Sequence, residues 1–109
     1  MSKYYSRKVI IDEIKFDSKK EGNRYLELKL LLKARKIRDL ELQKKFELLP
    51  KYKINGKTIR AISYVADFVY WDISKNEMII EDTKGFKTEV YKLKKKLFEY
   101  KYGIEIKEV

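Results

Sequence analysis

Cysteine and histidine are both absent from the 109 residues of this sequence. Without cysteine the chain forms no disulfide and no thiolate zinc site. Without histidine it has no histidine-metal centre, no Ser-His or Cys-His nucleophile system, and no nuclease mechanism that uses a histidine base. Any catalysis must therefore depend on carboxylates, lysines, tyrosines or a bound metal ion.

Long apolar runs are missing as well. No segment approaches the roughly 20 apolar residues of a membrane-spanning helix, and Ser2 to Lys8 is polar and basic with no apolar core after it. We therefore expect no signal peptide, no membrane partner and a reducing, cytoplasmic setting. Negative charge is comparatively scarce, because 27 Lys and Arg against 17 Asp and Glu give a net charge of +10. A surplus of this size favours a polyanionic partner, most simply nucleic acid.

The first helix signal begins at Ser18, which forms a capping box with Glu21 and predicts a helix from about Lys19 to Ala34 or Arg35. At about 100° per residue, Glu21 lies in the middle of an apolar stripe, so it is either a cap alone or a cap and a site residue. A second apolar side makes the helix either sandwiched or part of an interface. The stripe contains Tyr25, Leu28 and Leu32, and the second side contains Leu26 and Leu30.

Alternating apolar residues and turn residues predict three strands, a second helix and a final strand. Lys51 to Lys57 is expected to be a loop with a tight turn at Asn55-Gly56. The whole is expected to be one domain over residues 1–109, with a basic N-terminal arm over residues 1–15. Gly103 is a suitable residue just after the end of the second helix. The predicted segments are Ile37 to Leu49, Ile59 to Trp71, Glu77 to Lys84, Glu89 to Tyr100 (with Val90, Leu93, Leu97 and Phe98 or Tyr100 facing the core) and Ile104 to Val109.

Two carboxylates interrupt the apolar strands, Asp67 in the second strand and Asp82 in the third, with Lys84 two residues further on. A hairpin centred between residues 74 and 75 places Asp67 opposite Asp82, with Cβ atoms roughly 5 Å apart and Lys84 on the same face. Carboxylates this close repel each other unless a cation lies between them. The alternative is a pair of core carboxylates neutralised by Lys84 and an arginine such as Arg60. Glu81 has the opposite phase and is expected at the surface.

The order α-β-β-β-α-β, with Asp67 and then Asp82-Thr83-Lys84 on adjacent strands, resembles the PD-(D/E)XK nuclease superfamily, many of whose members place an acidic residue where Glu21 stands. The sequence is more closely similar to a family of small phage-encoded proteins, long of unknown function and assigned to that superfamily. One departure is Ala66, where the superfamily usually has proline. The likeness spans about residues 3–109 and is carried by Phe16-Asp-Ser-Lys-Lys-Glu21, Asp39-Leu-Glu-Leu-Gln43, Tyr64-Val-Ala-Asp-Phe-Val-Tyr70 and Glu81-Asp-Thr-Lys-Gly85.

The resemblance implies an α/β (α+β) fold with a restriction-endonuclease-like αβββαβ core, in which helices flank a mixed central sheet. It implies a metal-dependent DNA endonuclease with catalytic roles for Glu21, Asp67, Asp82 and Lys84. Mg²⁺, or Mn²⁺ in its place, would be held by Asp67, Asp82, Glu21 and the Thr83 carbonyl, with Gln43 beside the site. The implied setting is phage DNA recombination, replication or packaging in a bacterial host, including Holliday-junction resolution or nicking. Symmetric cutting needs two sites and favours a homodimer, with Leu26 and Leu30 as a candidate interface.

The lysines around the last helix are either a solvated face or contacts to a DNA backbone. One rival function is a non-catalytic double-stranded nucleic-acid-binding module, because double-stranded RNA-binding domains share the α-β-β-β-α order and a basic second helix. That module does not explain acids inside apolar strands. A second rival is a nuclease fold with an inert site. The lysines are Lys87, Lys92, Lys94, Lys95 and Lys96.

Overall fold

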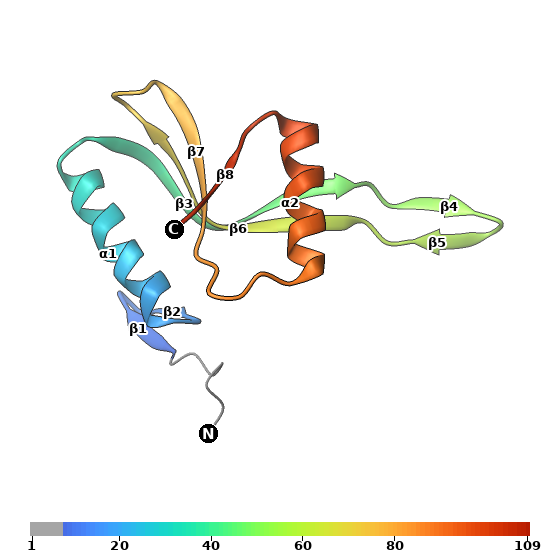
Figure 1. Ribbon diagram of the computed structural model, residues 1–109, viewed down its shortest axis with the longest axis horizontal. Coiled ribbons are helices and arrows are strands. Elements are labelled where there is room, and N and C mark those ends of the chain that lie inside the picture. The colour runs from blue at the N-terminus through green and yellow to red at the C-terminus, as the bar shows by residue number, and fades with distance from the viewer. Residues whose placement is uncertain (1–7) are drawn as a thin grey trace.

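The computed structural model describes residues 8–109 and places a four-stranded sheet between two helices (Figure 1). The strand order is β3 (Ile37–Leu49), β6 (Ile62–Asp72), β7 (Glu77–Asp82) and β8 (Ile106–Glu108). Neighbouring strands are antiparallel except β7 and β8, which are parallel. The sheet is therefore mixed, and the expected α/β (α+β) class is confirmed.

Helix α1 (Lys19–Lys33) covers one face of the sheet, and it starts where the capping box predicts. The Ser18 Oγ atom accepts a 3.1 Å hydrogen bond from the Glu21 backbone N–H, which satisfies one of the free donors of the first turn. The inward stripe of the helix is also as expected, and Leu26 and Leu30 on the other side are exposed. The buried residues of α1 are Glu21, Gly22, Tyr25 and Leu28.

A short hairpin of β1 (Val9–Ile11) and β2 (Ile14–Phe16) packs against α1. A Cβ atom on Gly22 would lie 2.7 Å from the Val9 Cγ2 atom, so the close approach of hairpin and helix requires glycine there. The N-terminal arm expected over residues 1–15 therefore includes an ordered hairpin. Residues 1–7 of that arm lie outside the described residues.

Helix α2 (Glu89–Tyr102) covers the opposite face and ends at Gly103, whose φ of 68° is the left-handed conformation that the sequence predicts at this position. The expected core-facing side of α2 is only partly right. Phe98 is buried as expected and Tyr91 is buried as well, whereas Val90, Leu93 and Leu97 are exposed. Neither helix in residues 8–109 combines the length and apolarity needed to cross a membrane.

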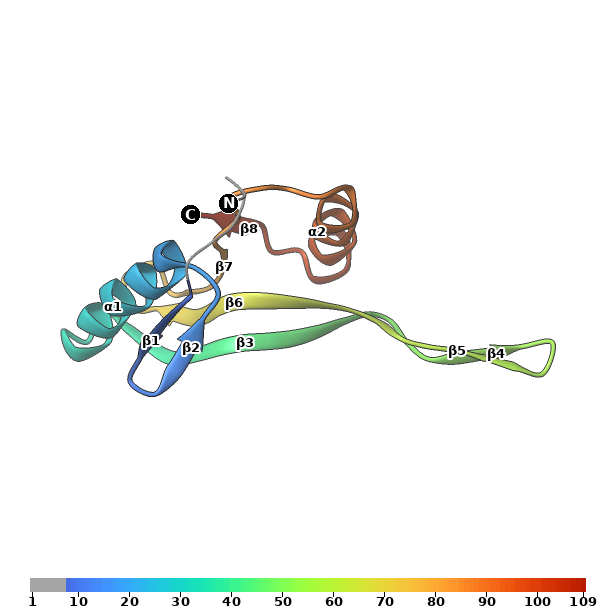
Figure 2. The same ribbon diagram turned by 90° about the horizontal axis from the view of Figure 1, so that it is seen from below.

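The segment expected as a loop forms a second hairpin, made of β4 (Tyr52–Ile54) and β5 (Lys57–Ile59). Asn55 and Gly56 turn the chain with φ values of 50° and 74°, as the tight-turn signal predicts. The loop prediction is wrong because the residues before the turn form a strand that pairs with the residues after it. Figure 2 shows this hairpin extending well beyond both helices.

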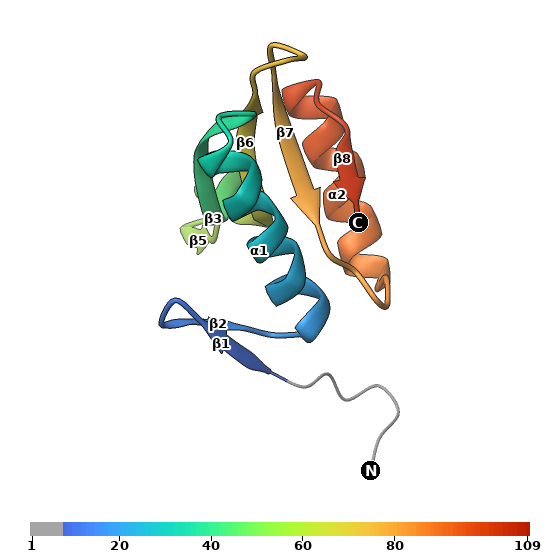
Figure 3. The same ribbon diagram turned by 90° about the vertical axis from the view of Figure 1, so that its left-hand side faces the viewer.

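Two hydrophobic cores lie on the two faces of the sheet, and Figure 3 shows the helices that cover them. Buried side chains in the core under α1 are Phe16, Tyr25, Leu28, Ile37, Phe68, Tyr70 and Ile79. Those in the core under α2 are Tyr64, Ala66, Val69, Ile80, Tyr91, Phe98 and Ile106.

Strand β6 contributes to both cores in an unexpected order. Simple alternation predicts one face for Tyr64, Ala66, Phe68 and Tyr70. Instead, the first two belong to the core under α2 and the last two to the core under α1. The alternation therefore breaks at Asp67, which lies between the two pairs.

The apolar side chains of β3 also move from one face of the sheet to the other, at the residue opposite Asp67. Leu40 and Leu42 pack against the core under α1, whereas Phe46 and Leu48 pack against the core under α2. Between them the backbone of Gln43 has a φ of 52°, in the left-handed region that few non-glycine residues adopt. Simple alternation predicts one face for Leu40, Leu42, Phe46 and Leu48. That prediction is wrong because the backbone at Gln43 reverses which face the following side chains point to.

Candidate functional site

The hairpin of β6 and β7 has the register that the sequence predicts. Its pairs run from Asp72 with Glu77 to Phe68 with Glu81, and residues of each pair are centred on the turn between positions 74 and 75. The next position on each strand carries a carboxylate, Asp67 on β6 and Asp82 on β7. The two carboxylates therefore lie where the strands separate, beyond the last paired residues.

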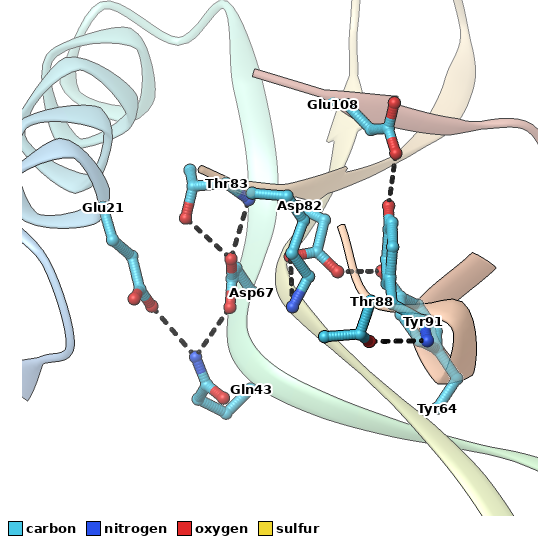
Figure 4. A network of polar contacts seen from close by, with 10 residues as sticks. Glu21, Gln43, Tyr64, Asp67, Asp82, Thr83, Thr88, Tyr91 and Glu108 are labelled. Carbon is cyan, nitrogen blue, oxygen red and sulfur yellow. Dashed lines mark hydrogen bonds and ion pairs between the residues drawn. The ribbon is translucent and has the colours of Figure 1, made fainter. Parts of the chain in front are cut away.

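Gln43 lies opposite Asp67 on β3, the strand that pairs with the edge of β6 away from β7. The pairs on either side of Gln43 keep one register, with Phe68 before it and Ala66 after it across the strands. Its Nε2 atom donates hydrogen bonds to Asp67 Oδ1 at 3.2 Å and to Glu21 Oε2 at 3.0 Å (Figure 4). The left-handed backbone of Gln43 thus places one amide between carboxylates of two different elements.

Asp67 is held most firmly by the residue that follows β7. Its Oδ2 atom accepts two 2.8 Å hydrogen bonds from Thr83, one from the backbone N–H and one from the hydroxyl. With the Gln43 amide on the other oxygen, both oxygens of Asp67 have donors. The arrangement ties β6 to the start of the 83–88 segment and fixes the direction of the carboxylate.

Glu21 reaches the site from the first turn of α1 and is only 5% exposed. Burial raises the pKa of Glu21 from 4.5 to about 7, and the negative charges of Asp67, Asp17 and Asp82 add to the effect. A hydrogen bond from the Asp17 backbone opposes it. Near neutral pH this carboxyl is therefore close to the point where it gains or loses its proton.

Asp82 is fully buried at the end of β7. Its Oδ2 atom accepts a 2.6 Å hydrogen bond from the Tyr64 hydroxyl, while Oδ1 has no hydrogen-bond partner among residues 8–109. Burial, with the charge of Asp67, raises the pKa of Asp82 from 3.8 to about 6, although the Tyr64 hydrogen bond and Lys84 act to lower the pKa. A buried oxygen without a donor is uncommon in native proteins and indicates a place for a ligand.

Lys84 brings the cation of the site. Its Nζ atom lies 3.4 Å from Asp82 Oδ1 and 4.9 Å from the centre of the Tyr91 ring. The ring face attracts the ammonium group, and the Tyr91 hydroxyl is itself held by a 2.8 Å hydrogen bond to Glu108. The lysine is therefore held beside the Asp82 oxygen that accepts no hydrogen bond, on the face that the sequence predicts.

An open cavity of about 310 Å³ gives solvent access to Glu21, Asp67 and Lys84, and the buried Asp82 lies behind its lining. The lining combines three carboxylates with two lysines, which is the composition of a site for a phosphate ester or a metal ion and not for an apolar ligand. The residues that line it are Asp17, Ser18, Lys20, Glu21, Asp67, Thr83, Lys84 and Gly85.

The donor atoms fit Mg²⁺ or Mn²⁺ in kind, because Glu21, Asp67 and Asp82 offer hard carboxylate oxygens. The Asp82 Oδ1 atom accepts no hydrogen bond from residues 8–109 and has only the Lys84 amine near it, at 3.4 Å, so a metal ion could also bind there. In the described part of the chain no three acidic side chains form a complete metal-binding group. Here Gln43 and Thr83 occupy the Asp67 oxygens that a metal ion would use.

Glu81 is the clearest error of the sequence analysis, which places it at the surface. It is completely buried under α1, where Arg24 donates two hydrogen bonds to its oxygens, at 2.7 and 2.6 Å, and Tyr70 donates another. Arg24 has the spacing of a helix surface residue, so nothing in the sequence pairs it with Glu81. The alternative partner considered for the core carboxylates, Arg60, is exposed and has no ion pair with a described residue.

The lysines near α2 are less available than the sequence implies. Lys94 and Lys96 have no ion-pair partner in residues 8–109, but the other three do. The paired ones are Lys87 with Glu108 at 2.9 Å, Lys92 with Glu89 at 3.3 Å, and Lys95 with Glu99 at 2.9 Å.

A family model described as "Protein of unknown function (DUF1064)" matches residues 1–108. The chain belongs to this family. No curated protein and no solved structure matches it. DUF1064 membership covers residues 1–108 and carries no activity with it.

Proposed function

We propose that this chain is a metal-dependent endodeoxyribonuclease that hydrolyses phosphodiester bonds. The observation that carries the proposal is the oxygen Oδ1 of Asp82, which is buried, lacks a hydrogen-bond donor and lies 3.4 Å from the Lys84 amine. A buried charge that is not fully paired is costly. A site that holds carboxylates and a lysine in this way, on a chain of net charge +10, suits a cation and a phosphate ester together.

Asp67, Asp82 and Glu21, with the Thr83 carbonyl, are the groups that would hold Mg²⁺, or Mn²⁺ in its place. When bound, the ion would supply polarisation of the scissile phosphate and a more acidic water. For Asp67 to take part, the Gln43 amide must give up Oδ1. Gln43 would then retain Glu21 and keep that carboxylate directed into the site.

Lys84 is the residue that we expect to act on the substrate directly. The Lys84 side chain is about one third exposed, whereas its partner Asp82 is buried. The ammonium group can therefore reach a phosphate oxygen or a water molecule that enters from solvent. A positive charge at that point stabilises the negative charge that develops on the phosphate during attack. The Tyr91 ring beneath it limits the directions in which the amine can move.

The substrate we propose is DNA of a particular structure, such as a junction or a nicked duplex, in the cytoplasm of a phage-infected bacterium. In residues 8–109 both helices pack on the central sheet, which leaves no separate module there for reading sequence, so the proposed cutting is structure-specific or weakly sequence-specific. The proposed partner for two-sided cutting is a second copy of the chain, docked through the exposed Leu26 and Leu30. If Leu26→Glu with Leu30→Glu leaves the mass in solution unchanged, that interface is wrong.

Incubation of the protein with branched, nicked, duplex and single-stranded DNA tests the activity. We expect cutting with Mg²⁺ or Mn²⁺ and none with EDTA. Asp82→Asn should reduce the rate at least about 100-fold, since it removes charge at the position of strongest stabilisation. Glu77→Gln is the matched control, because it makes the same kind of change at an exposed position of the same strand.

Metal binding can be measured independently of DNA cutting, by the effect of the metal ion on thermal unfolding. Mg²⁺ should raise the melting temperature of the wild type, because a ligand that binds only the native state stabilises it, and Asp82→Asn should remove the shift. If Asp82→Asn cuts as well as the wild type, the nuclease proposal is lost. Tight binding of double-stranded nucleic acid with no cutting would favour the binding module, and a metal shift without cutting would favour the inert nuclease fold.

A further inference from the structure

The hairpin β4–β5 and its flanking residues project from the sheet as a two-stranded ribbon, defined here as residues 51–60. Figures 1 and 2 show it in line with β3 and β6 and beyond the cover of either helix. Every side chain from Lys51 to Thr58 is exposed. A two-stranded hairpin without a core is marginally stable in water, so its projection needs a reason outside the monomer.

The charge of the ribbon is all of one sign. No acidic residue occurs between Glu47 and Asp67. None of the ribbon's four cations has an ion pair or hydrogen bond among the described residues, in contrast to the lysines near α2, most of which are paired. Four unpaired cations on a thin projection attract a polyanion. They are Lys51, Lys53, Lys57 and Arg60.

The ribbon also has an apolar side. Tyr52 lies opposite Ile59, and Ile54 lies opposite Lys57, so these four share one face. Tyr52 is 44% exposed and Ile54 is 55% exposed. Exposed apolar groups beside unpaired cations are suited to a surface that offers both phosphates and base edges, such as a DNA groove.

We propose that the ribbon inserts into the major groove of B-form DNA, with its cations on the phosphates at the groove edges. The groove, about 12 Å wide, admits a two-stranded ribbon, whereas the major groove of A-form RNA is too narrow and deep for side chains to read. The proposal rests on the proposed function for its choice of DNA. It adds a second contact, far from the carboxylates, that sets where duplex DNA lies.

The reach of the ribbon matches the repeat of the double helix. Gly56 at the tip is eleven residues from Asp67 along the chain. At roughly 3.3 Å per residue, this spacing is at most about 36 Å, and one turn of B-form DNA is about 34 Å. A duplex with its backbone at Asp67 would therefore offer a groove to the tip one turn away.

Charge removal tests the contact. In the ribbon variant, Lys51, Lys53, Lys57 and Arg60 are all changed to Gln, and in the control variant Lys29, Lys33, Lys36 and Lys75 are changed to Gln. All eight side chains are exposed, and both variants lower the net charge from +10 to +6. Any difference between them therefore reports position and not total charge. Circular dichroism and thermal melts check that both fold.

The readout is the dissociation constant for a 30-base-pair DNA duplex, measured by fluorescence anisotropy in EDTA at several salt concentrations. We expect the ribbon variant to bind at least about tenfold more weakly than the control. The slope of log affinity against log salt should become shallower by about 3 to 4, because each lost phosphate contact contributes about 0.9. Equal affinities of the two variants would overturn the proposal. So would equal binding of wild type to double-stranded RNA.

The groove itself can be mapped because the chain has no cysteine. Asn55→Cys creates a single attachment point at the tip for an iron–EDTA probe, whose radicals cut nearby DNA. Cuts offset between the strands in the direction typical of the major groove support the proposal, and minor-groove or scattered cuts overturn it. A ribbon variant that turns a dimer into a monomer, measured by light scattering, would show that the ribbon joins two copies and would also overturn it.

The two proposals fail separately. A wild type that binds duplex DNA through the ribbon in EDTA, but never cuts with Mg²⁺ or Mn²⁺, refutes the nuclease and supports the ribbon contact. A ribbon variant that binds like its control while metal-dependent cutting persists refutes the ribbon contact and supports the nuclease.

Discussion

The hydroxyl of Tyr64 donates a 2.6 Å hydrogen bond to Asp82 Oδ2, so the tyrosine occupies one oxygen of this buried carboxylate and leaves the other for the side of Lys84. Burial and the neighbouring carboxylate raise the pKa of Tyr64 above its usual value, which keeps the hydroxyl a donor. The pair fixes the orientation of Asp82 and determines which of its oxygens can accept a ligand.

Tyr64→Phe should weaken the fold and the site together. The change removes the only hydrogen bond that Asp82 accepts from a described side chain hydroxyl, and hydrogen bonds to charged groups contribute about 1.5–3 kcal/mol. We expect the free energy of unfolding in urea at pH 8 to fall by an amount in that range. Tyr52→Phe, an exposed hydroxyl on the ribbon, is the control and should change it by less than about 0.5 kcal/mol. A smaller loss for Tyr64→Phe than for the control would contradict this account.

Stability should fall as the pH rises from about 4 to about 7. Folding raises the pKa of Asp82 from 3.8 to about 6 and that of Glu21 from 4.5 to about 7. In this window the native state still holds protons that the unfolded chain has released, so unfolding becomes easier with rising pH. Each group should contribute on the order of 2 kcal/mol to the change.

Urea unfolding at several pH values measures this slope. Glu21→Gln and Asp82→Asn should each flatten it, because neither variant can release the proton concerned. Glu77→Gln should leave it unchanged, since Glu77 is exposed. A wild type whose stability rises steadily from pH 4 to pH 7 would show that the two carboxyls are not destabilised by burial.

Lys84→Met should separate catalysis from metal binding. On the proposed function, the loss of the ammonium group lowers the cutting rate by about 100- to 1,000-fold, as the loss of one transition-state donor does elsewhere. The melting-temperature shift produced by Mg²⁺ should persist, because removing a cation 3.4 Å from Asp82 Oδ1 favours another cation there. Lys75→Met, which removes an exposed lysine far from the α2 lysines, is the control. Loss of the Mg²⁺ shift would make Lys84 a structural residue.

Arg24→Met should be among the most destabilising single changes. It leaves the fully buried Glu81 without its cation, which typically costs about 3–5 kcal/mol. Adding Glu81→Gln should recover part of the loss, because no uncompensated charge then remains. Arg38→Met breaks an exposed ion pair with Asp39 and should cost less than about 1 kcal/mol. Guanidinium unfolding of the three variants decides whether the buried pair holds α1 to β7.

Local signals predicted much of this fold because they act over short stretches of chain. Ser18 and Gly103 fix helix ends through hydrogen bonds and backbone conformation within one turn. The turn between β6 and β7 fixes their register, so the adjacent placement of Asp67 and Asp82 follows from counting residues. Distances of a few residues were sufficient for each of these predictions.

The change of faces in β3 and β6 could not be predicted in this way. It depends on a left-handed backbone at Gln43, and glutamine in a sequence does not predict this conformation. Helical spacing also does not determine which side of α2 is buried, because two sets of large side chains recur at the spacing of a helix face. The sheet accepts Tyr91 and Phe98, and aromatic rings bury more surface than Val90 or Leu93.

Glu81 and the ribbon were missed because their partners are distant in the chain or outside it. The Arg24–Glu81 pair joins residues 57 positions apart. The ribbon contains the strongest hairpin signal in the sequence, but a turn signal gives no indication that the strands beside it leave the sheet. Both features depend on tertiary placement, which alternation and capping do not encode.

β3 and β6 carry both hydrophobic cores, since each strand contributes side chains to the core under α1 and to the core under α2. Neither core can therefore unfold as an independent cooperative unit, because both cores include side chains of the same two strands. Gln43 and Asp67 lie where the strands pass from one core to the other. Damage to the packing beneath either helix consequently reaches the carboxylates through the backbone that they share.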